Sequence, residues 1–254
     1  MTTDTHKEGQ RDGPKAYSAP RGRLKSDIRF LSGHFHLLRN QRIACIISKN
    51  NEEVTGSVKD DELIVDFVLA ETPRLYLREF NIDDVDSVYA YAGDPETTYF
   101  MDWGPESYPN VQNFVLSVLK GQILEPRRVF EFAICLKDSG RMIGACSLYL
   151  DDAGEQAELG YILHRDFHHQ GLMTEAAKAA LRFGFMNLNL HRIHASCDSM
   201  NAASENVMKR IGMRKEAEMK SCCHVRVGRR KQWRSKKVYA MLQKEYLLAE
   251  LSRG

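Results

Sequence analysis

The stretch AELGYILHRDFHHQGLMTEAAKAALRFGFM (residues 157–186) joins a strand-like run to a run of strong helix formers through a polar turn that contains one glycine. A strand, a turn and a helix in this order leave the first amides of the helix at the turn, without partners inside the helix. These amides carry partial positive charge and can bind an anion without a lysine. Gly171 would let the backbone approach a phosphate there, although a glycine before a helix is more often part of a tight turn. The sequence has neither GxxxxGK[ST] nor GxGxxG, which excludes a Walker A loop and a dinucleotide-binding loop.

The elements around this unit predict a mixed sheet with helices on its faces. Strands are expected over 74–80, 129–137, 142–150, 157–164 and 192–198, helices over 81–94, 109–124, 172–188 and 204–213, and a strand or helix over 238–247. The turns DSGR and DDAGEQ between the three middle strands are short, so these strands should form an antiparallel meander.

Length and composition predict one large domain with an appendage. The chain has 254 residues, 43% of them apolar and 28% charged, as in ordinary globular proteins. It has no apolar run long enough to cross a bilayer and no secretory signal at its start, which predicts a cytoplasmic protein. Residues 1–26 are expected to be a disordered tail, 27–70 an extension of unknown role with two apolar strand-like runs, and 71–254 the folded domain.

The cysteines do not indicate a metal site, and one segment near the C-terminus is rich in basic residues. Six cysteines are present without a CxxC pair, which favours buried free thiols over a disulfide framework or a zinc site. Residues 220–237 contain eight basic residues and no acidic one. We interpret this run as a solvated basic loop or hairpin, with a surface for an anionic partner as the alternative.

Four blocks of the chain resemble the GNAT acetyltransferase superfamily. TPRLYLREF (72–80) resembles its opening strand, AELGYILH (157–164) the strand along the acyl-CoA arm, HHQGLMTEA (168–176) its pyrophosphate loop, and NAASENVMKRIGM (201–213) its following helix. The blocks stand in family order over about residues 71–247, and they are most similar to the branch of the ribosomal-protein N-terminal acetyltransferases. The resemblance implies an α/β (α+β) fold with a mixed, mostly antiparallel sheet, splayed central strands, helices on both faces and an N-terminal extension.

The resemblance also implies acetyl-CoA as the donor, no metal, and direct attack of an amine on the thioester. The backbone of Tyr161 and Leu163 should pair with the pantetheine arm, and Asn201 and Ser204 should line its far side. The pyrophosphate should be held by the amides of His169, Gln170, Gly171, Leu172, Met173 and Thr174.

Four positions depart from the family pattern. His168 stands where arginine is frequent, and the bulky Met173 occupies a position that is usually small. Met208 stands where many members have a tyrosine that protonates the leaving thiolate, so the thiolate would leave unprotonated or take a proton from water. Ser235 replaces a common aspartate near the last strand.

Glu158 is the candidate base, because it shares a strand with Tyr161 and could accept the amine's proton through a water. The alternative is a glutamate on the polar face of a strand. Glu175, in the first turn of a helix, is explained by the helix dipole alone. Trp103 either lines the acceptor site or anchors its loop by packing.

The sequence therefore predicts an N-acetyltransferase acting on a primary amine, which could be a protein N-terminus or a small molecule such as a polyamine, an antibiotic or an amino acid. The alternatives are a GNAT-like module that binds acyl-CoA without turnover, and a ribosome or RNA binder that uses the basic run at 220–237. No membrane partner is expected, and the chain should be a monomer or a homodimer.

Overall fold

The computed structural model describes residues 68–227 and 230–252, so the predictions for the tail and for most of the extension lie outside the described residues. The strands are β1 (Val68–Glu71), β2 (Leu75–Glu79), β3 (Val129–Leu136), β4 (Met142–Leu150), β5 (Gln156–Leu163), β6 (Arg192–Asp198), β7 (Arg214–Val227) and β8 (Arg230–Leu242). The helices are η1 (Ile82–Asp84), α2 (Val85–Ala92), α3 (Tyr108–Gln122), η2 (Arg165–Phe167), α4 (Leu172–Met186), α5 (Ala202–Arg210) and α6 (Gln243–Leu251).

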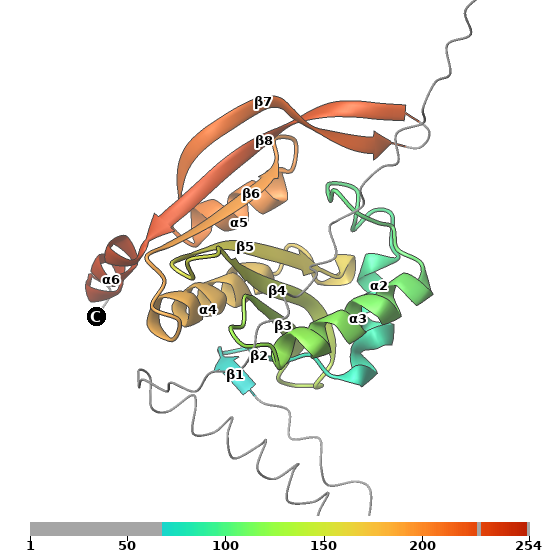
Figure 1. Ribbon diagram of the computed structural model, residues 1–254, viewed down its shortest axis with the longest axis horizontal. Coiled ribbons are helices and arrows are strands. Elements are labelled where there is room, and N and C mark those ends of the chain that lie inside the picture. Colours follow the sequence, from blue (N-terminus) through green and yellow to red (C-terminus); the bar gives the residue numbers. More distant parts are fainter. Residues whose placement is uncertain (1–67, 228–229, 253–254) are drawn as a thin grey trace, which may run out of the picture. The chain divides into compact units, whose positions relative to one another are not determined.

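The eight strands form one sheet in the order β1-β2-β3-β4-β5-β6-β8-β7, as Figure 1 shows. The strands β3, β4 and β5 pair antiparallel in chain order, which confirms the predicted meander. Among the described strands, only β5 and β6 pair parallel, and the connection between them is the turn at 164–171 followed by α4. The predicted fold class, a mixed and mostly antiparallel sheet with helices, is confirmed.

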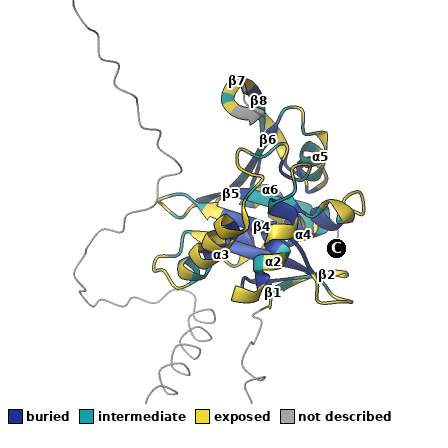
Figure 2. Ribbon diagram, turned by 90° about the vertical axis from the view of Figure 1, so that its right-hand side faces the viewer, coloured by how far each residue is buried: buried dark blue, intermediate teal, exposed yellow. Residues whose placement is uncertain are grey.

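Helices cover both faces of the sheet. On one face, alanines and large apolar residues of α4 pack on the apolar side chains of β3, β4 and β5, including Phe132, Leu148 and Leu159. On the other face, α2 and α3 pack on a smaller cluster around Ala133, Cys135 and Ala145. The central strands are accordingly coloured as buried in Figure 2, while the outer surfaces of the helices are exposed. The smaller cluster leaves part of that second face to polar side chains.

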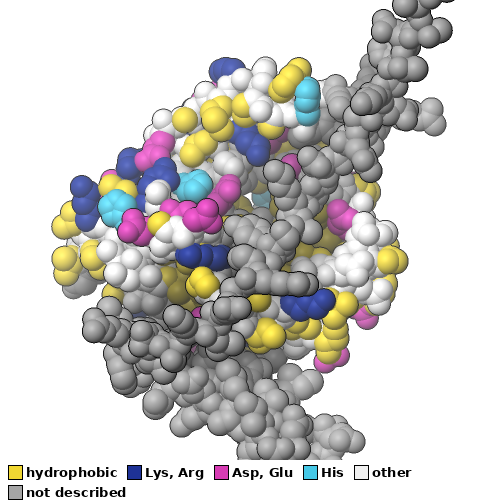
Figure 3. All heavy atoms as spheres, viewed as in Figure 1, with side chains coloured by type: hydrophobic (Ala, Val, Ile, Leu, Met, Phe, Trp, Pro, Cys, Tyr) yellow, Lys and Arg dark blue, Asp and Glu magenta, His cyan; other side chains and the backbone are white. Residues whose placement is uncertain are grey.

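The described residues of the basic run at 220–237 belong to a hairpin formed by the long strands β7 and β8, which is compatible with both interpretations of the run. Several of its charges are paired: Lys220 with Glu218, Arg234 with Asp198 at 3.0 Å, and Lys237 with Glu205 at 2.7 Å. Figure 3 shows the result, a face on which basic and acidic side chains lie side by side. The last predicted element is partly strand and partly helix, since β8 ends at Leu242 and α6 follows.

Three of the described cysteines are buried free thiols, as predicted: Cys135, Cys146 and Cys197 on β3, β4 and β6. Cys222 and Cys223 are also free, but they lie on the two-stranded hairpin, where Cys222 is exposed and Cys223 half-buried, so the prediction of burial is wrong for them. No group of three or more potential metal-ligating side chains occurs among the described residues. None of the described helices combines the length and the apolar character needed to cross a membrane.

Candidate functional site

The strands β5 and β6 diverge in the middle of the sheet. They pair only over Gln156–Glu158 and Arg192–His194, although β5 continues to Leu163 and β6 to Asp198. The residues of β5 from Leu159 to Leu163 therefore have no partner on β6 along this edge. A backbone edge of this kind can accept an extended ligand as if it were a further strand. Tyr161 and Leu163, predicted to bind the pantetheine arm, both lie on it.

The turn after β5 leads the chain into α4 through residues with left-handed backbone angles. Gly171 is the residue before the first turn of α4, with φ of 76°, and His169 has φ of 61°. Glycine adopts this conformation without strain, which other residues do not. The amides of Leu172, Met173 and Thr174 begin the helix, so they belong to the group that has no intrahelical acceptor. The predicted phosphate turn thus has the backbone geometry that an anion site requires.

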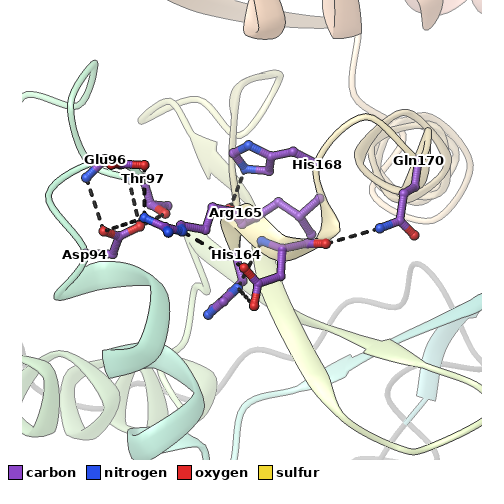
Figure 4. A network of polar contacts seen from close by, with 9 residues as sticks. Asp94, Glu96, Thr97, His164, Arg165, His168 and Gln170 are labelled. Atoms are coloured by element: carbon purple, nitrogen blue, oxygen red, sulfur yellow. Dashed lines mark hydrogen bonds and ion pairs between the residues drawn. The ribbon is translucent and has the colours of Figure 1, made fainter.

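Side chains of this turn bond within the turn and to its neighbours. His168 Nε2 lies 2.9 Å from the carbonyl oxygen of Leu163, and Gln170 Nε2 donates to the carbonyl of Asp166 at 3.2 Å. Figure 4 shows that Arg165 reaches the segment after α2, where its Nη1 lies 2.9 Å from Glu96 Oε2. The side chains of His168 and Gln170 thus shape the turn.

Hydrogen bonds from Arg74 and Thr72 also hold the turn and the first turn of α4, and the sequence did not predict these contacts. Arg74 donates from Nη1 to the carbonyl of Gln170 at 2.9 Å and from Nε to Glu175 at 2.8 Å, and Thr72 Oγ1 donates to the same carboxylate at 2.6 Å. Burial alone would raise the pKa of Glu175, but the bonds from Thr72 and Arg74 hold it below its ordinary value. Glu175 therefore joins α4 to the start of β2, a role beyond the helix dipole. The sequence signal for this contact was Arg74, the first of the two arginines in TPRLYLREF.

The start of α5 lies against β5. Asn201 caps this helix by accepting the amide of Ser204 at 3.0 Å. The Ser204 hydroxyl lies 2.9 Å from the hydroxyl of Tyr161. Met208, one turn further on, is fully buried and has no acidic hydrogen to give. The structure thus brings Tyr161, Asn201 and Ser204 together, as the sequence predicted, but their side chains are already engaged with one another.

A row of polar side chains crosses the sheet where β5 and β6 begin to diverge. In the strand register, Tyr149 lies opposite Glu158, and Glu158 lies opposite His194. Glu158 is exposed and accepts a hydrogen bond from Ser196 at 3.0 Å, across the point of divergence. His194 Nδ1 is buried without a hydrogen-bond partner among the described residues. An unsatisfied buried nitrogen is uncommon and calls for an explanation such as a functional role.

Two further residues can now be placed. Trp103 lies in the loop between α2 and α3 and is 39% exposed, so its ring is not part of the core. Ser235 lies on β8, where its hydroxyl accepts the amide of Ser221 at 3.0 Å across the hairpin. It is therefore a structural residue of the hairpin in this chain.

Residues 74–214 match the family described as acetyltransferase (GNAT) domain. The chain is 33% identical over 175 residues to YnaD of Bacillus subtilis (strain 168), described as an uncharacterized N-acetyltransferase, and the match covers 69% of this chain and 97% of that protein. A crystal structure of a GNAT-family acetyltransferase from Bacillus anthracis has a TM-score of 0.60 at 28% identity, over 70% of this chain and 99% of that one. RimL, a ribosomal L7/L12 alpha-N-protein acetyltransferase solved with coenzyme A, has a TM-score of 0.60 at 19% identity, over 69% of this chain and 97% of that one.

Proposed function

The chain belongs to the GNAT acetyltransferase family and is an N-acetyltransferase, and from this premise we propose that it transfers the acetyl group of acetyl-CoA to a primary amine. The observation that carries the proposal is the succession of three features along the chain. The exposed carboxylate of Glu158, the edge of β5 that is not paired with β6 and the left-handed turn at Gly171 follow one another in this order.

The donor would lie along the edge of β5. The backbone of Tyr161 and Leu163 would pair with the amides of the pantetheine arm, and Asn201 and Ser204 would face the arm from α5. The amides from His169 to Thr174 would hold the pyrophosphate, because the helix dipole favours negative charge at this end of α4. The thioester of the bound donor supplies the electrophilic carbon.

The position of Glu158 suits a base. It stands at the last residue pair before β5 and β6 diverge, so it lies beside the end of the edge on which the arm would run. Ser196 donates to one carboxylate oxygen of Glu158, and no described residue donates a hydrogen bond to the other. Glu158 would accept a proton from the nitrogen as the carbon–nitrogen bond forms and the carbon–sulfur bond breaks.

The acceptor class is proposed to be a protein N-terminus or a small amine. RimL, which shares the fold, acts on a protein N-terminus. A free α-amino group has a pKa of about 8, compared with about 10.4 for a lysine amine, so it supplies far more of the neutral, reactive form at pH 7. Trp103, exposed between α2 and α3, is the candidate to contact the acceptor.

A turnover screen tests this function. The full-length protein is mixed with acetyl-CoA and with peptides bearing free N-termini, polyamines, amino acids and aminoglycosides, and thiol release is measured together with the mass of the product. We expect thiol release in step with acetylation of at least one class. Binding of acetyl-CoA without amine-dependent thiol release in any class would contradict the proposal and leave a non-catalytic binder.

A further inference from the structure

A second carboxylate, Glu131, lies on the same face of the sheet as Glu158 and has no part in the steps above. Glu131 is on β3 and is 5% exposed. Its side chain accepts a hydrogen bond from the hydroxyl of Tyr149 at 2.6 Å. Tyr149 is 44% exposed and lies directly opposite Glu158 in the register of β4 and β5. Tyr149 therefore lies beside Glu158 in the sheet and is hydrogen-bonded to the buried carboxylate of Glu131.

Gly160 makes this connection possible. In the register of the sheet, Glu131 lies opposite Ser147, and Ser147 lies opposite Gly160. A Cβ at position 160 would come within 2.6 Å of Ser147 Oγ and 3.4 Å of Tyr149 Cε2. A side chain there would displace both neighbours, so the glycine leaves room for the Tyr149 ring to lean toward Glu131.

No cation forms an ion pair with Glu131 among the described residues. The nearest candidate, Arg127, directs both terminal nitrogens to Glu79, at 2.7 and 3.0 Å. Removing a carboxylate from water without a partner is unfavourable, and burial accordingly raises the pKa of Glu131 to about 7, against the lowering effects of Tyr149 and Arg127. Perturbed acids of this kind concentrate at functional sites.

The titratable groups around Glu131 and Tyr149 do not have a pKa near 7. Burial and the charge of Glu131 raise the pKa of Tyr91 on α2 and of Tyr149 on β4 far above neutrality, and Glu158 on β5 adds to the effect on Tyr149. Burial and the charge of Glu131 also raise the pKa of Cys146, although its side chain belongs to the cluster on the opposite face of the sheet. These three groups therefore stay protonated at neutral pH. Of this set, Glu131 is the group whose proton exchanges near pH 7.

We propose, resting on the function proposed above, that Tyr149 and Glu131 take the first of the two protons that an acceptor ammonium must lose, and that Glu158 takes the second. The ammonium gives a proton to the Tyr149 oxygen while the Tyr149 hydroxyl proton moves to Glu131, and the nitrogen becomes neutral. The neutral nitrogen then attacks the thioester carbon, its next proton goes to Glu158, and the carbon–sulfur bond breaks to release the thiolate. The thiolate takes a proton from water, and the protons held by Glu131 and Glu158 return to the solvent, where one neutralises the hydroxide. The sum is an amide, a thiol and one released proton.

The test uses Glu131→Gln, which keeps an acceptor for the Tyr149 hydroxyl, and Tyr149→Phe, which keeps the ring. Each should lower kcat/KM for the amine by tenfold or more at pH 6.5 to 7. The defect should disappear above the pKa of the acceptor, where the amine arrives neutral. Affinity for acetyl-CoA and the melting temperature should stay at parental values. Tyr108→Phe is the matched control, because Tyr108 donates to Asp86 at 2.7 Å and is 39% exposed, but belongs to α3 and should have no effect.

A structural role would give a different result. If Glu131→Gln or Tyr149→Phe lowered kcat/KM equally at every pH, or left it at the parental value near pH 7, the proton pathway would be wrong while the acetyltransferase activity stood. An inactive parent would overturn both proposals. Infrared spectroscopy gives a readout without turnover: the band of a protonated carboxyl should fade as the pH rises through about 7 and be absent from Glu131→Gln. A parental spectrum that equals that of the variant would also overturn the pathway.

Discussion

The donor side and the acceptor side of the proposed site are built in different ways. The donor side uses backbone groups of almost consecutive residues, from the edge of β5 to the first turn of α4. The acceptor side uses side chains of three strands, with Glu131 on β3, Tyr149 on β4 and Glu158 on β5. Backbone recognition tolerates changes of side chain, whereas recognition by side chains does not. This difference explains why His168 and Met173 can depart from the family pattern, and it leads to four predictions.

The largest effect is expected on the acceptor side. Glu158→Gln keeps the shape of the side chain but removes its basicity, so the rate should fall by about 10² to 10⁴. The fall should persist at high pH, because the proton released during attack still needs an acceptor, and this separates Glu158 from Glu131. Steady-state kinetics from pH 6 to 10 is the measurement. A variant that turns over at the parental rate at pH 7 would remove Glu158 from the mechanism.

The next effect concerns the hairpin that continues the sheet beyond β6. Arg234 and Asp198 form an ion pair with side-chain exposures of 7% and 4%. Arg234→Leu leaves Asp198 buried and unpaired, so the free energy of unfolding should fall by about 3 to 5 kcal/mol. Replacing both residues with leucine should recover most of this loss.

Lys220→Ala is the matched control for that pair. Lys220 also pairs with an acid of the hairpin, Glu218, but its side chain is 77% exposed, so the change should be about 1 kcal/mol or less. Chemical denaturation measures the free energy of unfolding of the parent, Arg234→Leu, the double leucine variant and Lys220→Ala. Equal losses for Arg234→Leu and Lys220→Ala would show that burial does not distinguish the two pairs.

On the donor side, Gly171→Val should weaken acetyl-CoA binding by at least about tenfold, the equivalent of one lost charge-assisted contact. The cause is the backbone, since φ is 76° there and a Cβ would meet only Arg74 Nη2, at 3.7 Å. Gly140→Val is a close control, with φ of 70° and a Cβ 3.7 Å from the Tyr76 hydroxyl, in the turn between β3 and β4. Calorimetry should show a lower affinity for the first variant only, and equal affinities would contradict the placement of the phosphate turn.

The smallest effect is expected at the anchor of that turn. Arg74→Ala removes the bonds to Gln170 and Glu175, and because the Arg74 side chain is 50% exposed, we expect a loss of about 1 kcal/mol of stability and a severalfold higher KM for acetyl-CoA, with kcat unchanged. The pKa of Glu175 is lowered in the folded protein, so its contribution is present above the ordinary pKa of a glutamate and is lost as the pH falls through the folded value. Thermal melts between pH 3 and 7 should therefore converge for parent and variant at the acid end. A constant difference across this range would exclude the ion pair as the source.

Much of the donor side could be predicted from the sequence. The strand before the turn, the glycine at 171 and the helix after it are local features, and their order along the chain already determines where the first amides of α4 lie. The basic run at 220–237 was interpreted as a solvated loop or hairpin, with a surface for an anionic partner as the alternative, and the hairpin of β7 and β8 is compatible with both. The 238–247 segment was predicted to be a strand or a helix, and it contains the end of β8 and the start of α6.

By itself, the sequence determined the meander and the strand, turn and helix from 157 to 186, and it gave the phosphate turn and Glu158 as hypotheses, but it did not predict β7 as a strand. Only the tertiary structure decided where β5 and β6 separate, which is after three residue pairs, that Arg74 reaches Glu175 from 101 positions away, and that Tyr149 is hydrogen-bonded to Glu131 while it lies opposite Glu158. The physical reason is the range of the forces involved. Propensity, periodicity and turn geometry act between near neighbours in the chain, whereas the burial of Glu131 depends on strand register and on a helix that packs over it.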